Sequence, residues 1–429
     1  MVKWGNRARR VHHKIVSLSY QSLIVQILYL QTLEAISPKK VLPGLLEKYN
    51  GQPVQVIATG KAAIDMACAL VKAGADIKHA LVITKKGHVS SEQQSVLAFP
   101  YIKILEATHP IPDAHSEKAG RELLQFARSL DPAIPIVYLL SGGTSALTAV
   151  PADGLALQQI RDVTEALLKS GATILEVNTV RKHITQVSGG QLREAFPEGA
   201  VLHTVVISDI LDNDMSVLGS GPCVPDPTTI QDALAVLERY KIEAPKMHKE
   251  TPKKSYDKDT VDIAISNLHA AEAFKNGADK AGIPSEISPE IITGDAQETG
   301  RKIAQEVRAR LQKSTDPIML IYRGEPVVTI DKACTGSGSR SMEVVLSALL
   351  ELHDIPGVTI AGFETDGTAA NTDAAGAIGE SGLIDQASGR SALLAHDTYP
   401  FFKKTGCLIT TGPTGNNVCD IYIAHIHQK

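Results

Sequence analysis

The sequence predicts an α/β protein in which a doubly wound, mostly parallel sheet forms an N-terminal domain and a second α/β domain follows. Three observations lead to this fold class. The chain has 429 residues, too many for one ordinary core. Aromatic residues make up 4% of the chain and hydrophobic residues 43%, an aliphatic balance that suits helices packed on parallel strands. From Val54 onward, short apolar runs alternate with stretches of helical periodicity, which indicates right-handed crossovers.

The N-terminal segment allows two interpretations. Basic residues crowd positions 1–14, an apolar run from Ile15 to Leu30 follows, and no acidic residue occurs before Glu34. A signal or transit peptide has this charge pattern, but polar residues interrupt the run and no small-residue cleavage site follows it. Apolar residues recur here at helical spacing, at Ile24, Ile27, Leu28 and Leu33. We therefore expect an amphipathic first helix.

Strand and helix signals alternate regularly through the first domain. The expected strands are apolar and bounded by turn residues, and the expected helices carry one apolar stripe. The strands cover 54–58, 79–84, 102–107, 134–140 and 203–208, and the helices cover 61–73, 117–130, 157–170 and 230–240.

A segment without any apolar period divides the chain. Residues 244–259 are rich in lysine and proline, which predicts a solvated linker or a mobile loop. The first domain would then cover 1–243 and the second 260–429. In the second domain we expect helices at 297–312 and 342–351 and strands at 261–266, 318–322, 327–330 and 357–363, the strand 327–330 pairing antiparallel with 318–322. The tail from 407 to 424 reads as strand, glycine turn, strand.

Charge and cysteine content narrow the class of protein. The formal net charge is −4 with both signs interspersed, so neither nucleic acid nor a membrane is the expected partner. The five cysteines are widely scattered and show no Cys-x-x-Cys or Cys/His spacing. We expect reduced thiols in a cytoplasmic protein without structural zinc.

The candidate chemistry lies where predicted strands end. The strand 357–363 runs into a loop with Asp366 and Asp373, and Thr372-Asp373 is expected to open an Ala-rich helix. Two further strands end in the Gly-rich loops Gly60-Lys61 and 141–145. Open α/β sheets bind ligands at this edge. A turn former or a helix cap explains each Asp taken alone, but the three junctions together indicate a phosphoryl-transfer site.

Each Gly-rich loop has the features of an anion site. Gly60-Lys61 does not have Walker A spacing, yet backbone amides, a helix dipole and the Lys61 ammonium would all attract an anion there. The other loop would cradle phosphate or carboxylate oxygens with its amides, and tight helix–strand packing is its alternative explanation. Its candidate residues are Ser141, Gly142, Gly143, Thr144 and Ser145.

Two more segments carry polar side chains of the required kinds. The segment from Asn178 to His183 includes Arg181 and Lys182, but on a helix at most two of its basic residues face a ligand. A solvated basic face is the alternative. Asp209 follows the strand 203–208 and offers a carboxylate for Mg²⁺, although acidic residues also initiate turns.

These motifs together resemble the class II glycerate kinases, the glycerate 2-kinase family whose C-terminal module is called the MOFRL domain. The resemblance runs from about Gln52 to Ile423. It rests on motifs in family order: Gly60-Lys-Ala-Ala63, Ser141-Gly-Gly-x-Ser-Ala-Leu147, Asn178-x-Val-Arg-Lys-His183, Thr365-Asp-Gly367 and Thr411-Gly-Pro-Thr-Gly-x-Asn417.

The resemblance implies ATP-dependent phosphorylation of D-glycerate at its 2-hydroxyl, with Mg²⁺ and with an active site in the cleft between a Rossmann-like domain and a MOFRL-type domain. It implies Lys61 and Arg340 as essential cations, and Asp209 is the third catalytic candidate. Asp209 and Asp366 are the metal candidates. A homodimer is compatible with the resemblance. The expected substrate- or nucleotide-binding residues are Gly60, Ser141, Gly142, Gly143, Thr144, Ser145, Asn178, Arg181, Lys182, Glu325, Asp373 and Asn417.

The chain also departs from the family pattern. Ala369 stands where similar kinases have an acidic residue, and Asn213 interrupts the usual Gly-Asp-Asp. These losses motivate one alternative, a sugar-acid-binding protein without catalysis. A second alternative is hydroxypyruvate reductase, a label that similar sequences often carry. A nicotinamide site would need Gly-x-Gly-x-x-Gly after a strand, and neither Gly-rich loop supplies it.

Overall fold

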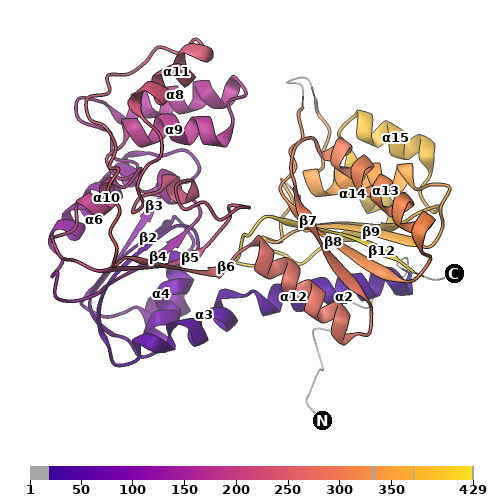
Figure 1. The fold of residues 1–429 in the computed structure, drawn as a ribbon, viewed down its shortest axis with the longest axis horizontal. Helices are drawn as coiled ribbons and strands as arrows, with labels where there is room; N and C mark the ends of the chain where they lie inside the picture. Colours follow the sequence, from indigo (N-terminus) through magenta and orange to yellow (C-terminus); the bar gives the residue numbers. More distant parts are fainter. Residues whose placement is uncertain (1–18, 331–333, 371, 428–429) are drawn as a thin grey trace. The chain divides into compact units, whose positions relative to one another are not determined.

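The computed structural model describes residues 19–330, 334–370 and 372–427, which fold into two compact units. Pro38–Ile265 form the first unit, and Ser266–Lys429 with Met1–Ser37 form the second. Within the described residues, each unit contains one six-stranded sheet covered by helices (Figure 1). The predicted α/β fold class with two domains is therefore confirmed.

The first unit contains a fully parallel sheet with strand order β3-β2-β1-β4-β5-β6. This order reverses between β1 and β4, and open α/β sheets bind ligands at the carboxyl edge of such a reversal point. The central strands are buried on both faces because helices cover both sides. The strands are β1 (Pro53–Thr59), β2 (Asp76–Lys85), β3 (Ile102–Ala107), β4 (Ile136–Ser141), β5 (Leu202–Ile207) and β6 (Thr260–Ile265).

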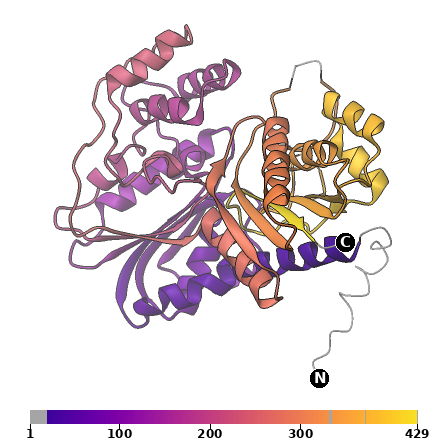
Figure 2. The ribbon, with the colours of Figure 1, turned by 45° about the vertical axis from the view of Figure 1, so that its right-hand side comes forward.

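The helices of the first unit form two groups. One group covers the sheet: α3 (Pro38–Leu46), α4 (Ala63–Lys72), α6 (Ala114–Arg128), α7 (Thr144–Leu147) and α10 (Gln191–Glu194). The short helix α5 (Ser91–Val96) lies against α4. The helices of the other group lie together at the top left of Figures 1 and 2. They have their own apolar cluster and are α8 (Leu157–Lys169), α9 (Ile174–Ile184) and α11 (Ile230–Arg239). The short 3-10 helices are η1 (Glu47–Tyr49) and η2 (Leu218–Ser220).

The division of the chain differs from the expected one. Residues 244–259 are part of the first unit, where Thr251 and Pro252 are buried and Asp259 accepts a 2.6 Å hydrogen bond from Arg193 Nε. The strand β6 that follows completes the first sheet and does not open the second domain. The polar residues of this segment suggested a solvated linker, but buried partners satisfy several of them.

The second unit contains a mixed sheet with strand order β11-β10-β9-β12-β8-β7, in which only β7 and β8 pair in parallel. Its strands are β7 (Ser285–Ile292), β8 (Ile318–Gly324), β9 (Val358–Glu364), β10 (Gly376–Glu380), β11 (Leu408–Ile409) and β12 (Asp420–Ile426). Its helices are α2 (Tyr20–Ala35), α12 (Asn267–Lys280), α13 (Ala296–Lys313), α14 (Arg340–Glu351), α15 (Gln386–Leu394) and α16 (Thr398–Thr405).

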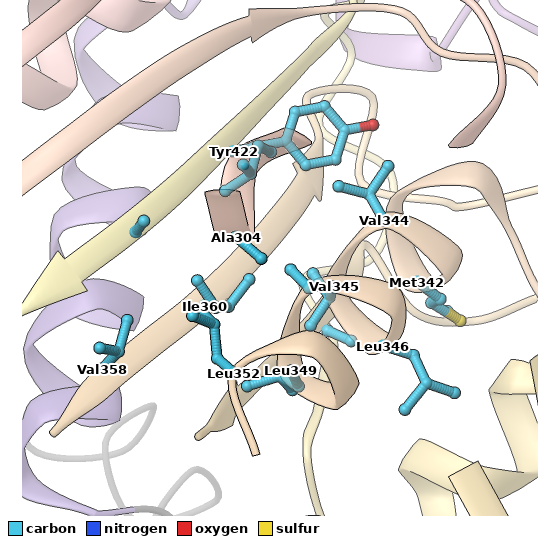
Figure 3. Packing of buried hydrophobic residues seen from close by; sticks show 14 of the residues in the cluster. Ala304, Met342, Val344, Val345, Leu346, Leu349, Leu352, Val358, Ile360 and Tyr422 are labelled. Atoms are coloured by element: carbon cyan, nitrogen blue, oxygen red, sulfur yellow. The ribbon is translucent and has the colours of Figure 1, made fainter. Parts of the chain in front are cut away.

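The core of the second unit is built around α14, whose residues from Ser341 to Leu350 are all buried. Figure 3 shows Val345 and Leu349 of this helix beside Ile360 of β9. Each such apolar side chain contributes about 1.5–3 kcal/mol when it leaves water. The helix is therefore held firmly against the sheet, and its first residue, Arg340, lies at a defined sheet edge.

Two predicted elements of the second unit are wrong. No helix begins at Thr372-Asp373, because residues Gly376–Glu380 form β10 and pair antiparallel with β9. Their small side chains suit close packing: a Cβ built on Gly376 would lie 1.9 Å from the carbonyl oxygen of Gly362. The segment 327–330 is not the antiparallel partner of β8, since β12 takes that place and Val327 forms only an isolated parallel bridge to Asp295.

The first described helix is confirmed, but only part of its predicted apolar stripe is buried. The buried side chains of α2 are Ser22, Val25, Leu28, Tyr29 and Thr32, whereas Ile27 of the predicted stripe is 45% exposed. The Tyr29 ring stacks on Phe363 of β9 at 4.1 Å, so α2 belongs to the second unit's core. The basic segment 1–14 lies outside the described residues. No helix among the described residues is long and apolar enough to cross a membrane.

Candidate functional site

The two Gly-rich loops of the first unit meet at the carboxyl edge of its sheet. Strands β1 and β4 are neighbours, with Thr59 opposite Leu140, so Gly60-Lys61 emerges beside Ser141-Gly142. The Lys61 backbone N–H donates to the Gly142 carbonyl at 2.9 Å, and the Ala62 N–H donates to Ser141 Oγ at 3.1 Å. The loops therefore form one hydrogen-bonded structure at the point where strand order reverses, which is where such sheets bind ligands.

Glycine is required in these loops for close packing. Gly60 has φ +118°, and a Cβ there would lie 2.4 Å from the Ser141 carbonyl oxygen. A Cβ on Gly142 would lie 1.9 Å from Asp209 Oδ2. The missing side chains thus let the loops approach each other and let the Asp209 carboxylate, which follows β5, reach the β4 loop. The structure brings Gly60, Lys61, the β4 loop and Asp209 together, as the strand-end argument predicted.

A histidine that the sequence analysis missed lies at the same edge. His109 follows β3, and a Cβ built on Gly143 would lie 3.3 Å from both His109 Nε2 and Lys61 Cε. The imidazole and the lysine side chain therefore border the same space above Gly143. The sequence contained a signal for it, because His109 stands two residues after the predicted strand 102–107, much as Lys61 follows the predicted strand 54–58.

Positive charge dominates the surroundings of this histidine. Burial lowers the pKa of His109, and the charges of Lys61, Lys85, Arg181 and His88 also lower it, so that the pKa is about 4. Within the described residues, neither the Lys61 ammonium nor the Arg181 guanidinium forms a hydrogen bond or an ion pair. Partly buried cations are normally paired. This edge of the first unit is therefore suited to bind an oxyanion.

The basic residues of α9 separate into different roles. Lys182 Nζ lies 3.1 Å from Asp226 Oδ1, with the two side chains 4% and 0% exposed. His183 Nε2 lies 2.9 Å from Glu250 Oε1. Lys182 therefore forms a buried structural ion pair, and we no longer expect it to bind a ligand. Only Arg181 of the three takes part in the cation cluster around His109.

Asn178 supports the β4 loop through a chain of side-chain hydrogen bonds. The Ser220 hydroxyl donates to Asn178 Oδ1 at 3.1 Å, and Ser220 Oγ lies 2.8 Å from Ser145 Oγ. Thr144 is buried and its hydroxyl donates to the Ser141 carbonyl at 2.9 Å. These contacts hold the loop in one conformation, so Asn178 and Thr144 position the loop through their protein partners.

The second unit presents a different charge arrangement around Arg340. Its Nε and Nη2 donate to the two oxygens of Asp420 at 2.7 and 3.0 Å, and Nη2 lies 3.0 Å from Glu325 and 3.9 Å from Glu364. Three carboxylates thus surround one guanidinium. Burial raises the pKa of Asp420 to about 7 and also raises the pKa of Glu364. Sequence reasoning found Arg340 and Glu325 but missed Asp420 and Glu364.

The remaining predicted residues of the second unit lie in loops beside β9 and β12. Asp366 Oδ1 accepts from the Thr368 N–H at 3.1 Å, Asp373 Oδ1 accepts from the Tyr399 hydroxyl at 2.6 Å, and Asn417 Oδ1 accepts from the Cys419 N–H at 3.2 Å. All three therefore have local structural partners.

Ala369, the position of the missing family carboxylate, is completely buried within the apolar cluster of the second unit. A carboxylate at this position would meet apolar side chains.

The described residues contain no group of three or more His, Cys, Asp or Glu side chains arranged to hold a metal ion. A protein cage is not required for Mg²⁺, which usually binds through one or two carboxylates, water and substrate phosphates. Asp209 beside the Gly-rich loop fits such a minimal site.

Comparison with known proteins agrees with the two-unit architecture. Residues 24–251 match a family model described as a domain of unknown function, DUF4147, and residues 318–420 match the MOFRL family. The D-glycerate 2-kinase of Thermotoga maritima is 38% identical over 425 residues, which cover 95% of this chain and 99% of that protein. A protein of Agrobacterium vitis, provisionally named hydroxypyruvate reductase, is 37% identical and is covered to 89%. The crystal structure of glycerate kinase from Thermotoga maritima aligns with TM-score 0.83 and 35% identity, covering 95% of this chain and 99% of that one.

Proposed function

The chain belongs to the family that joins a DUF4147 domain to a MOFRL domain, and we propose that it transfers the γ-phosphoryl group of ATP to the 2-hydroxyl of D-glycerate. The products are 2-phosphoglycerate and ADP. The observation that carries the proposal is the cation cluster at the switch point of the first sheet, where the Lys61 ammonium and the Arg181 guanidinium form no hydrogen bond or ion pair with the described residues. The glycerate kinase names of the relatives supply the substrate.

The geometry suits phosphoryl transfer because this reaction depends mainly on positioning and charge neutralisation. Lys61 and Arg181 neutralise the phosphoryl oxygens or hold the substrate carboxylate, and the planar fork of Arg181 fits two oxygens at once. The backbone amides around Gly142 and Gly143 add preorganised donors. Bound Mg²⁺ supplies further charge neutralisation, and Asp209 is the residue that would hold it in the first unit.

For the second unit we propose that Arg340 is the other essential cation. Asp420 holds the guanidinium at two of its nitrogens, so its direction is set before any ligand binds. Asp366 remains the lower-ranked metal candidate. The location that we propose is the cytoplasm, on the ground that all five cysteines are free thiols.

ADP release in the presence of ATP, Mg²⁺ and D-glycerate tests the activity directly. Product coupling through enolase without phosphoglycerate mutase reports the 2-phosphate, whereas a signal that requires the mutase would indicate the 3-phosphate. Two further assays cover the alternatives. NADH or NADPH oxidation with hydroxypyruvate but no ADP release would favour the reductase. Binding of D-glycerate without turnover by either assay would favour a non-catalytic sugar-acid-binding protein.

Replacing Lys61 tests the placement of the site. We expect Lys61→Met to lower kcat/KM by about 10²–10³, the usual loss for one preorganised charged donor. Lys72→Met is the matched control, because Lys72 is an exposed lysine on the helix that follows the same loop. Thermal unfolding of both variants checks that the fold is intact. If Lys61→Met and Lys72→Met had equal activity, Lys61 would lie outside the site.

A further inference from the structure

We propose that His109 is the base that takes the proton of the substrate hydroxyl while that hydroxyl is phosphorylated. The inference rests on the kinase activity proposed above and adds a catalytic residue to it. His109 follows β3 at the carboxyl edge of the first sheet, and its Nε2 borders the space above Gly143 together with the Lys61 side chain. An acceptor oxygen bound beside Lys61 therefore lies within reach of the imidazole.

The imidazole is available for this role because its ring nitrogens form no hydrogen bond among the described residues. Two other histidines of the same unit have protein partners: His183 Nε2 lies 2.9 Å from Glu250 Oε1, and His203 Nδ1 lies 2.8 Å from Thr260 Oγ1. A partly buried imidazole without a partner at a ligand-binding edge needs the ligand to satisfy it.

The charged groups around His109 favour its neutral form. Lys61 faces it from the loop after β1, Lys85 and His88 from the end of β2, and Arg181 from α9. The nearby carboxylates are engaged elsewhere, with Asp209 packed on Gly142 and Glu106 accepting from the Gly87 N–H at 2.7 Å. Because the ring is partly buried and cations surround it, the pKa of His109 falls to about 4, and the unprotonated nitrogen is present at neutral pH.

Substrate binding should raise the pKa of His109, and a higher pKa makes the imidazole a stronger base. An oxyanion beside Lys61 and Arg181 offsets their charge, so the pKa of His109 rises when the ligand binds. A base is most effective when its pKa is near the working pH. The empty site therefore keeps the imidazole neutral, and the occupied site makes it a stronger base.

The proposed step transfers one proton and one phosphoryl group. The O–H bond of the 2-hydroxyl breaks and its proton moves to the unprotonated nitrogen of His109. The oxygen forms a bond to the γ-phosphorus of ATP. The bond from that phosphorus to the β-phosphate oxygen breaks, and its electron pair leaves with ADP. The imidazolium then releases the proton to water, which restores the neutral base.

Kinetics of His109→Gln test the proposal, because glutamine keeps a polar side chain of similar reach but cannot accept the proton. We expect kcat to fall about 10²-fold, the lower end of general-base effects. In the wild-type enzyme the acid limb of kcat should lie at higher pH than the acid limb of kcat/KM, since kcat reports the ligand-bound state. In His109→Gln the limb of kcat should disappear. His115→Gln is the matched control, because the His115 side chain is exposed and its Nδ1 lies 3.1 Å from Asp113 Oδ2.

Chemical rescue separates a base from a positioning residue. Added imidazole should restore at least tenfold activity to His109→Gly and none to His109→Gln, where glutamine fills the space. NMR of the His109 ring in the wild-type protein should show a higher pKa with D-glycerate bound than without it, a readout that needs no variant to fold. An acid limb that persists in His109→Gln, or a ring pKa that D-glycerate leaves unchanged, would overturn the proposal. Wild-type protein without ADP release would instead reject the kinase function itself.

Discussion

Arg181 and Lys182 are sequence neighbours of like charge whose surroundings assign them opposite roles. The Lys182 ammonium is buried against Asp226, and this pairing helps to lower the pKa of the Asp226 carboxyl. The Arg181 guanidinium has no partner among the described residues, and burial alone lowers its pKa. The Lys182 side chain therefore stabilises the fold, and the Arg181 side chain is available to bind an anion.

This difference predicts opposite effects of two variants: Lys182→Met should lower stability, and Arg181→Met should lower activity. Lys182→Met should lower the free energy of unfolding by about 3–5 kcal/mol, because it leaves the buried Asp226 carboxylate unpaired. Arg181→Met should not lower the free energy of unfolding, because it removes an uncompensated charge, but kcat/KM for phosphorylation should fall about 10²-fold. Urea unfolding and steady-state kinetics on both variants measure the two effects. Loss of stability in Arg181→Met would mean that the guanidinium has a structural partner.

The loop after β1 depends on glycine for close packing as well as for its backbone conformation. A Cβ on Gly60 would lie 2.4 Å from the Ser141 carbonyl oxygen, within the hydrogen-bonded pair of loops. Gly171 also has positive φ, at +80°, but it faces open space. Substituting Gly171 therefore measures only the free-energy cost of a left-handed backbone. Substituting Gly60 adds the cost of losing contact between the two loops.

Gly60→Ala should be considerably more harmful than Gly171→Ala. The latter carries only the left-handed backbone cost of about 1–2 kcal/mol. Gly60→Ala adds a steric clash that pushes the β1 and β4 loops apart, so we expect a larger stability loss and a fall of at least tenfold in kcat/KM. Thermal unfolding and the ADP-release assay compare the pair. Equal effects at both positions would show that contact between the loops has no catalytic consequence.

The two folded units do not correspond to two consecutive halves of the chain. The first unit is the continuous stretch Pro38–Ile265, but the second unit takes α2 from the N-terminal side of that stretch. Tyr29 of α2 stacks on Phe363 with 8° between the rings and donates a 2.9 Å hydrogen bond to the Glu364 carbonyl. The N-terminal helix thus completes the core of the C-terminal unit.

Fragments of the chain should reflect this connectivity. We expect residues 38–265 expressed alone to unfold in one cooperative thermal transition, since they contain their own sheet and apolar clusters. Residues 266–429 alone should be destabilised, and a synthetic peptide of residues 19–37 should raise their melting temperature. The control peptide carries Tyr29→Ala and Val25→Ala, which removes the buried contacts. Stability of 266–429 that no peptide changes would contradict the role assigned to α2.

The sequence by itself determined the fold class, most strands of the first sheet and the strand-end positions of Lys61, Asp209 and the β4 loop. These follow from short-range rules: apolar period, glycine at tight turns, and polar residues where a parallel strand ends. The tertiary structure decided which side chains face one another. It placed His109 beside Lys61, paired Lys182 with Asp226, and surrounded Arg340 with carboxylates. The Ala-rich segment 372–377 does not open the predicted helix, because its last residues begin β10. This strand pairs with β9 at a close-packed edge that only small residues fit. Such choices depend on partners distant in sequence, and local periodicity contains no information about them.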